Sequence, residues 1–391
     1  MIGVEEALKA LEDNRPDWGT VELPLDQING LELAQDIIAP FNHPKSSVSV
    51  MDGYAFRTDD AEKPLDLIGE SRAGVPYDGE LGAGEAVRIF TGALLPKGAD
   101  QVEMQENAVL NGQTVSFSSL STHRNFVRKA GSDFSKGACL YPKGRRVTPE
   151  MILGIATCNF VALTVKRKPT VALLSSGDEL RSAGSMLSDA TIINSINPAL
   201  AALLTQWGVI VQDLGIATDN ENDINDRIAN CDADIIVPIG GASVGNYDLM
   251  QPIAKSLGFD PVFSKVAVKP GKPTWFSKRG DQCILGLPGN PSSAWVCAQV
   301  FLKPFILGRQ PLKTAILDQS ISKNGPRETY LRGKYLANGH VAPLSRQDSG
   351  LVTPLGDADI LIRVPAYSNR LNKGDKATIV KFGQHFQSSN S

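Results

Sequence analysis

Residues 171–180 read Val-Ala-Leu-Leu-Ser-Ser-Gly-Asp-Glu-Leu. The four apolar residues predict a short buried strand, and two hydroxyls, a glycine and two carboxylates follow it directly. Similar apolar runs recur at 209–214 and 235–239, and helix-spaced segments lie at 198–207 and 221–230. Strands that alternate with helices are typical of a doubly wound parallel α/β sheet, here of about 140 residues.

The alternation continues towards residue 310. Apolar runs at 266–268 and 284–287 predict two further strands of the same sheet, and 292–305 has helical spacing. The unit is preceded by Lys-Arg-Lys-Pro at 166–169, a basic stretch closed by proline. We interpret that stretch as a linker between domains.

The rest of the chain has different patterns. Residues 4–11 have helical spacing, whereas the sequence from there to about 137 is rich in Gly, Pro and Asp with short apolar runs, which predicts β structure with many turns. Helical spacing returns near 151–156, followed by an apolar run at 161–165. Beyond 311, short runs separated by Gly, Asn and Asp suggest a small β-barrel or sandwich.

Composition excludes several classes of protein. The 391 residues are too many for one ordinary domain, and 39 basic against 42 acidic side chains give a net charge of −3. That balance offers no bulk attraction for nucleic acid or an anionic membrane, so an anion must be captured by a local cluster. No apolar run reaches membrane-spanning length and the N-terminus resembles no export signal, so we expect a cytoplasmic protein. Five cysteines and four histidines are scattered, which disfavours a disulfide framework or a zinc site.

Ligands of open α/β sheets bind outside the carboxyl ends of the strands. After the first strand come Ser175, Ser176, Gly177 and Glu179, and after 235–239 comes Gly-Gly-Ala-Ser-Val-Gly, followed by Asp248. Such glycines let the backbone form an anion-binding nest, to which Ser243 adds a hydroxyl. A plain strand-to-helix turn explains the motif about equally well, and the spacing does not match a dinucleotide-binding GxGxxG.

Two further strand ends have the same character. Lys265, Lys269 and Lys272 lie within eight residues, and two of them belong to a Lys-Pro-Gly-Lys-Pro segment that favours oxyanion binding over a solvated basic loop. The segment 286–293, Gly-Leu-Pro-Gly-Asn-Pro-Ser-Ser, opens a helix whose first turn offers free N–H groups, although simple capping is the alternative. Four such ends at one sheet edge predict a single shared pocket.

The N-terminal half adds Met-Asp-Gly-Tyr-Ala-Phe at 51–56, Thr-Gly-Ala at 91–93 and Gly-Ser-Asp at 131–133. Asp-Gly is also a common hairpin turn, so Asp52 alone fits a structural role. Carboxylates in these segments would equally suit a hard cation such as Mg²⁺, which bridges oxygen ligands and phosphates.

The order MDGYA, TGA, GSD, SSGDEL, GGASVG, KPGKP and LPGNP resembles the molybdopterin molybdenumtransferases, the MoeA-type family related to the E domain of gephyrin. The resemblance runs from about residue 4 to 385. It implies a multidomain α/β fold with a MogA-like doubly wound α/β domain, an inserted β-rich domain, a small helical N-terminal domain and a C-terminal β-barrel-like domain. The implied divisions are 1–20 with 138–168, then 21–137, 169–310 and 311–391.

The resemblance also implies the activity. In that family, molybdate is inserted into adenylylated molybdopterin with release of AMP and the help of Mg²⁺, at a site formed at a homodimer interface. Transient contacts with the molybdopterin adenylyltransferase or with factors that mature the recipient molybdoenzymes are implied as well. Adenylyl-molybdopterin and molybdate are anions, so the lysines and glycine N–H groups suit the same chemistry.

Matching positions give the candidate site. Catalytic positions fall on Asp52, Asp133, Glu179, Asp219, Asp248, Lys265, Lys269 and Lys272, of which Glu179 and Asp248 would hold Mg²⁺. Substrate-binding positions are Thr91, Ser175, Gly177, Gly240, Gly241, Ser243, Gly245, Pro288, Gly289, Asn290, Pro291, Arg332 and Ser349.

The chain departs from the family pattern in loops near the expected site. Ser-Ser-Val-Ser-Val at 46–50 replaces Phe-Asp-Asn-Ser-Ala, and Asn-Ser-Ile at 194–196 replaces an Asp-Ser-Asn motif. Two alternatives therefore stay open: a molybdopterin-binding or scaffold paralogue that has lost catalysis, and an enzyme that inserts tungstate.

Overall fold

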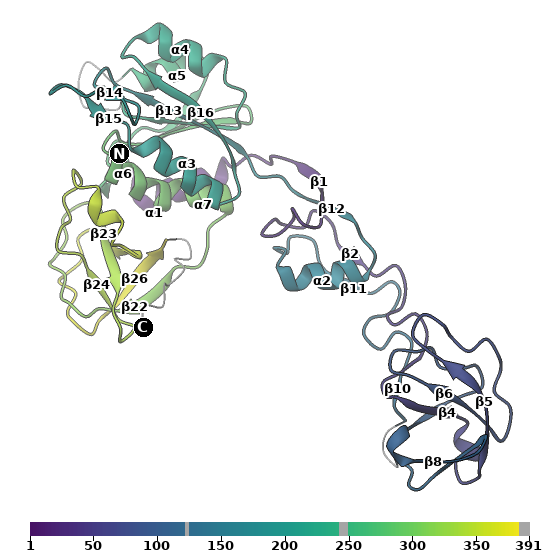
Figure 1. Cartoon of the computed structure of the whole chain (residues 1–391). Helices are drawn as coiled ribbons and strands as arrows, with labels where there is room; N and C mark the ends of the chain where they lie inside the picture. The colour runs from purple at the N-terminus through teal and green to yellow at the C-terminus, as the bar shows by residue number, and fades with distance from the viewer. Residues whose placement is uncertain (122–124, 242–248, 383–391) are drawn as a thin grey trace. The chain divides into compact units, whose positions relative to one another are not determined.

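The computed structural model describes residues 1–121, 125–241 and 249–382. The chain forms two compact units, each described here by itself: Met1–Gly19 with Arg167–Ser391, and Thr20–Lys166. Figure 1 labels many of their helices and strands. The helices of the first unit are α1 (Val4–Asp13), α3 (Ile196–Gln206), α4 (Glu221–Ala229), α5 (Met250–Ser256), α6 (Pro291–Cys297) and α7 (Lys303–Leu307).

The first unit contains a six-stranded sheet in the order β16-β13-β17-β21-β20-β18. Its strands are β13 (Thr170–Ser176), β16 (Ile210–Ala217), β17 (Ile235–Ile239), β18 (Asp260–Phe263), β20 (Trp275–Arg279) and β21 (Gln282–Gly286). The multidomain α/β architecture is confirmed, and β16, β13, β17 and β21 are parallel as expected. Strand β20 runs against the parallel strands and pairs antiparallel with both β21 and β18. Only two residues join β20 to β21, and so short a turn permits only a hairpin.

Helices lie on both sides of this sheet (Figure 1), and alternate residues of β13 belong to different cores. Val171 and Leu173 belong to the core formed with α1, α3, α6 and α7. Ala172 and Leu174 belong to the core formed with α4 and α5. Both faces of the sheet are thus covered, which explains why its strands are continuous apolar runs.

Two expected elements differ in the structure. The single helix predicted over 292–305 is divided into α6, a π-helical turn at Ala298–Leu302 and α7. Pro304 has no N–H to continue the α-helical ladder, which accounts for the interruption before it.

The strand predicted at 266–268 does not belong to the α/β sheet. The observed strand β19 (Val268–Lys269) pairs with β23 of a second sheet, with Val268 beside Glu328. That second sheet has the order β19-β23-β25-β26-β22, with β24 beside β23. Its remaining strands are β22 (Lys313–Ile316), β23 (Glu328–Tyr335), β24 (Val341–Pro343), β25 (Ile360–Val364) and β26 (Lys376–Lys381). The lysine segment therefore connects the two sheets of this unit.

Two short strands, β14 (Leu180–Arg181) and β15 (Ile192–Ile193), pair with each other beside the α/β sheet. Helix α1 packs Val4, Ala7 and Leu11 into the core of the first unit. The division of the chain into four domains remains a prediction.

The second unit is β-rich, with one six-stranded sheet in the order β7-β4-β6-β5-β9-β8. Its strands are β4 (Gly53–Phe56), β5 (Leu65–Ser71), β6 (Glu85–Ile89), β7 (Gln101–Met104), β8 (Ala108–Asn111) and β9 (Thr114–Phe117). The remaining elements are the pairs β1 (Thr20–Pro24) with β12 (Ala162–Lys166), β2 (Ile37–Ile38) with β11 (Cys139–Tyr141), β3 (Val48–Ser49) with β10 (Val127–Arg128), and helix α2 (Pro149–Thr157).

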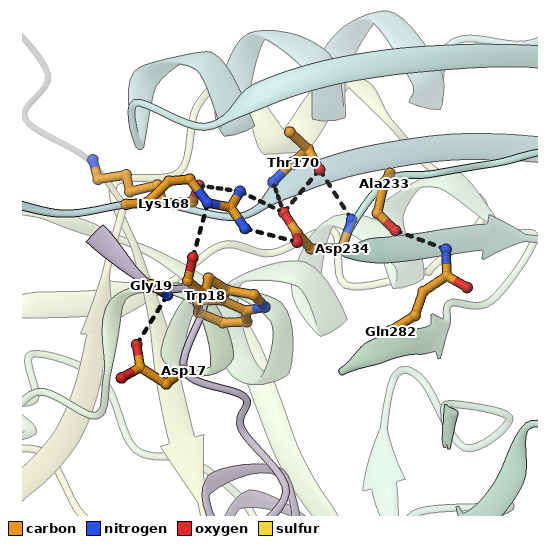
Figure 2. A network of polar contacts seen from close by, with 9 residues as sticks. Asp17, Trp18, Gly19, Lys168, Thr170, Ala233, Asp234 and Gln282 are labelled. Carbon is orange, nitrogen blue, oxygen red and sulfur yellow. Dashed lines mark hydrogen bonds and ion pairs between the residues drawn. The ribbon is translucent and has the colours of Figure 1, made fainter. Parts of the chain in front are cut away.

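The boundary between the units falls within the predicted linker, after Lys166. Both terminal nitrogens of Arg167 donate to the carboxylate of Asp234, at 2.8 and 2.9 Å. The N–H and hydroxyl of Thr170 donate to the same carboxylate (Figure 2). Nε of Arg167 also donates to the carbonyl of Trp18 at 2.9 Å. The end of the linker is thus fixed to β17 by charge-assisted hydrogen bonds.

No helix in the described ranges is both long enough and apolar enough to cross a membrane.

Candidate functional site

A cavity of about 450 Å³ lies at the carboxyl ends of the parallel strands. The segments after β13, β17 and β21 and the Pro-Gly-Lys-Pro segment all contribute to its wall. Of the residues singled out in the sequence, Ser175, Gly177, Glu179, Asp219, Gly240, Gly241, Pro288, Gly289, Asn290 and Pro291 line it. The strand ends therefore do meet at one cavity.

The segment after β13 supplies hydroxyls and carboxylates. The Ser176 hydroxyl donates to Asp219 at 2.7 Å, and the N–H of Asp219 donates to Asp178 at 3.1 Å. Glu179 is exposed, and its carboxylate folds over Gly177, where a Cβ would lie 2.5 Å from Oε2. These contacts hold Asp219 in a fixed geometry and leave the carboxylate of Glu179 accessible.

The segment after β17 depends on its glycines. Gly240 and Gly241 have φ of 91° and 63°, values that L side chains rarely adopt. A Cβ on Gly240 would also lie 2.9 Å from the carbonyl oxygen of Ser176. Position 240 therefore requires glycine for two reasons, its backbone conformation and the close approach of the Ser176 carbonyl. Ser243, Gly245 and Asp248 lie outside the described residues.

The segment after β21 approaches this glycine pair. A Cβ on Gly289 would come within 3.1 Å of the Gly240 Cα. Asn290 precedes helix α6 without capping it, and its buried Oδ1 accepts no hydrogen bond from the described residues. A buried acceptor with no protein donor is suited to an N–H or O–H of a ligand.

The lysines lie apart from the cavity lining. Gly271 and Pro273 belong to the wall, whereas Lys269 and Lys272 are exposed and Lys265 is half-buried. The segment rests on helix α6, because a Cβ on Gly271 would collide with the Cys297 sulfur. Burial raises the pKa of the Cys297 thiol to about 12, so it packs here as a neutral group.

Arg332 is 3% exposed and supports a loop of the C-terminal sheet. Its guanidinium donates to the Ser292 hydroxyl at 3.0 Å and to the carbonyls of Arg346, Asp348 and Leu351 at 2.8–3.0 Å. Burial lowers the pKa of Arg332, and no carboxylate forms an ion pair with it in the part of the chain the structure describes. Ser349, half-buried, lies within the loop that these bonds hold.

Asp52 and Thr91 meet in the second unit. Oδ1 of Asp52 accepts the backbone N–H of Thr91 at 2.7 Å and the Thr91 hydroxyl at 2.9 Å. These two hydrogen bonds, the backbone one first, hold the pKa of Asp52 below its ordinary value. Asp133 is exposed in the same unit, and its N–H donates to the carbonyl of His43 at 3.0 Å.

The sequence did not single out Asn197 as a site residue, although it is buried directly behind the cavity. Its Oδ1 accepts the Ser175 hydroxyl at 2.7 Å, and its Nδ2 donates to Asp213 at 3.1 Å. An asparagine within an otherwise apolar helical run was the available signal. Ser175 lines the cavity, and its hydroxyl donates this hydrogen bond, which joins α3 to β13; its contact with substrate remains a prediction.

A divalent cation would find carboxylates at this cavity. Glu179 and Asp219 both line it, and Mg²⁺ commonly takes one or two carboxylates together with water and substrate phosphates. No cluster of three or more His, Cys, Asp or Glu suited to a metal occurs in the described ranges. Of the two residues expected to hold Mg²⁺, Glu179 thus lines the cavity, whereas Asp248 lies outside the described residues.

These features define a multidomain α/β protein with a ligand site at the edge of a doubly wound domain. Three family profiles match: the MoeA N-terminal region (domain I and II) over residues 2–158, a probable molybdopterin binding domain over 172–308, and the MoeA C-terminal region (domain IV) over 314–382.

Named relatives match over nearly their whole lengths. A molybdopterin molybdenumtransferase of Haemophilus influenzae is 33% identical, covering 98% of this chain and 99% of the relative. One of Bacillus subtilis is 32% identical, covering 95% and 92%. A crystal structure of a molybdopterin biosynthesis MoeA protein from Pyrococcus horikoshii superposes with a TM-score of 0.87 at 27% identity, covering 98% of this chain and all of that one. The chain belongs to the MoeA family of molybdopterin molybdenumtransferases, transferases of molybdenum cofactor biosynthesis.

Proposed function

We propose that the chain inserts molybdate into the dithiolene of adenylylated molybdopterin, with cleavage of the phosphoanhydride bond and release of AMP. The observation that carries this proposal is the meeting of the strand-end segments, with their glycine N–H groups and carboxylates, at one cavity. Oriented N–H groups stabilise negative charge that develops on a phosphoryl or molybdate oxygen.

The space available suits a large substrate. A second cavity of about 400 Å³ shares Ser195, Ile196 and Pro291 with the first. Its other walls are mainly apolar side chains of α3 and α6, with Val352, Leu355 and Phe382. Adjoining polar and apolar spaces match a substrate that carries both an anhydride and planar rings.

The residue roles follow from chemistry. We assign Glu179 and Asp219 to positioning Mg²⁺ and contacting the nucleotide, because both line the cavity. Mg²⁺ would neutralise charge on the phosphoanhydride when bound. The three lysines flank the segment that contributes Gly271 and Pro273 to the wall, and we assign them to attracting molybdate and phosphate towards the cavity. We assign Arg332 and Ser349 to holding the loop beside the Leu-Pro-Gly-Asn-Pro segment. We assign Asp52, Thr91 and Asp133 of the β-rich unit to substrate contacts, and we propose that the chain acts as a homodimer.

Purified chain is tested with adenylyl-molybdopterin, molybdate and Mg²⁺, with AMP measured by chromatography and active cofactor by reconstitution of a molybdenum-free recipient enzyme. We expect AMP release that requires molybdate and stops when EDTA removes the cation. Tight substrate binding without AMP release would refute the proposal and favour a scaffold. Tungstate replaces molybdate in a parallel reaction, and a preference for tungstate would change the assigned substrate.

A further inference from the structure

The guanidinium of Arg88 in β6 packs against two aromatic rings. Its guanidinium carbon lies 4.8 Å from the Tyr54 ring centroid and 5.1 Å from that of Phe90. Both rings restrict the orientation of the side chain and leave the edges of its plane for hydrogen bonding.

The same guanidinium joins the Asp52 turn. One terminal nitrogen donates to the Gly53 carbonyl at 3.5 Å and the other to Oε1 of Gln105. The N–H of Gln105 in turn donates to the Asp52 carbonyl at 3.1 Å. Arg88, Gln105, Asp52 and Thr91 thus form one hydrogen-bonded cluster at the ends of the neighbouring strands β4, β6 and β7.

The cation in this cluster has spare donors. A guanidinium carries five N–H groups, and the two contacts above occupy only part of them. Arg88 forms no ion pair with a carboxylate in the ranges the structure describes, and the nearby Asp52 uses Oδ1 for Thr91. Arg88 and Asp52 are half-buried and Thr91 is exposed, so the cluster is open to a ligand.

The surroundings of Arg88 favour ligand binding over a purely structural role. The Arg88 charge helps to lower the pKa of Asp52, but no direct ion pair joins the two side chains in the described residues, and the remaining N–H groups of the half-buried guanidinium are open to a ligand. A planar guanidinium held in a fixed orientation can donate two parallel hydrogen bonds to two oxygens of a tetrahedral anion.

We propose that Arg88, together with the Thr91 hydroxyl, binds an oxyanion of the substrates, either a phosphate oxygen of the adenylyl group or molybdate. The choice of these two anions rests on the proposed function, whereas the presence of an oxyanion site rests on the cluster alone. Arg88 would then be a substrate-contacting residue of the β-rich unit, beside Asp52.

The test uses the full-length chain and titration calorimetry with AMP and, separately, with sodium molybdate. Arg88→Met keeps an unbranched apolar side chain against the rings and removes the charge, and Arg88→Lys keeps the charge without the planar guanidinium. Arg72→Met is the matched control, because Arg72 lies in the same unit and pairs with exposed Glu70 at 2.9 Å.

We expect Arg88→Met to weaken binding of one of the two anions by about tenfold, the loss expected for one charge-assisted hydrogen bond. Arg88→Lys should weaken that binding less, and Arg72→Met should leave it unchanged. The anion affected identifies the ligand. Unchanged binding of both anions by Arg88→Met and Arg88→Lys would overturn the proposal. Since calorimetry requires no turnover, absence of AMP release by the wild-type chain would contradict the proposed function without bearing on Arg88.

Discussion

Glu179 is the residue at which chemistry and folding are most readily separated. It is exposed, lines the cavity and holds no other described element in place, so Glu179→Ala should leave the free energy of unfolding within about 0.5 kcal/mol of wild type. The rate of AMP release should fall roughly 30- to 1000-fold, which corresponds to a loss of about 2–4 kcal/mol of transition-state stabilisation. Urea unfolding and initial rates measure both. Asp189→Ala, exposed and outside the cavity lining, is the control, and equal loss of rate in both variants would contradict the assigned role.

Thr91 is predicted to set the pH range over which Asp52 is ionised. Its N–H and hydroxyl both lower the pKa of Asp52, and Thr91→Val removes only the hydroxyl. The pKa of Asp52 should therefore rise, so that the acidic limb of the pH–rate profile moves to higher pH. Thr91→Ser keeps a hydroxyl and should restore the wild-type profile. An unmoved acidic limb in Thr91→Val would show that ionisation of Asp52 does not control the rate.

The attachment of the linker end to the start of β17 depends on the carboxylate of Asp234. Burial by itself raises the pKa of Asp234, but hydrogen bonds from Arg167 and Thr170 outweigh it and lower the pKa below the ordinary 3.8. The carboxylate thus contributes stability that is fully present above pH 3.8 and is lost as pH falls through the lowered pKa.

Asp234→Asn should therefore reduce the free energy of unfolding by about 2–3 kcal/mol at pH 7, because charge-assisted hydrogen bonds to Arg167 are lost (Figure 2). The difference from wild type should shrink at acidic pH, as measured by urea denaturation from pH 7 to pH 3. Asp232→Asn, which changes a neighbouring exposed acid, is the control. A difference that stays constant over this range would contradict a contribution from ionised Asp234.

Elements with local signals could be predicted from the sequence, and those decided by distant partners could not. The apolar run at 235–239 matches β17 residue for residue. A strand that is buried on both faces consists almost entirely of apolar residues, so it can be recognised from its own composition. Strand β19 pairs with Glu328 and Thr329, about sixty residues away, and nothing near Val268 indicates that choice. Likewise, the strand ends could be predicted to share a pocket from topology, whereas the bond from Ser175 to Asn197 depends on side-chain geometry.

At the scale of the whole molecule, a net charge of −3 repels anionic substrates, whereas the local lysines attract them. Added salt weakens both interactions, so screening the repulsion would speed association and screening the attraction would slow it. The Debye length is about 10 Å at 0.1 M salt, so the long-range repulsion is screened first, and local attraction should still dominate the encounter. We expect kcat/KM for adenylyl-molybdopterin to fall about three- to tenfold between 50 and 300 mM NaCl. The double variant Lys269→Gln with Lys272→Gln should reduce the dependence of kcat/KM on salt concentration. Lys9→Gln, which breaks an exposed ion pair with Asp13, should show the same salt dependence as the wild type. A kcat/KM that rises with salt would mean that the overall negative charge governs association and that the lysines do not guide the substrate.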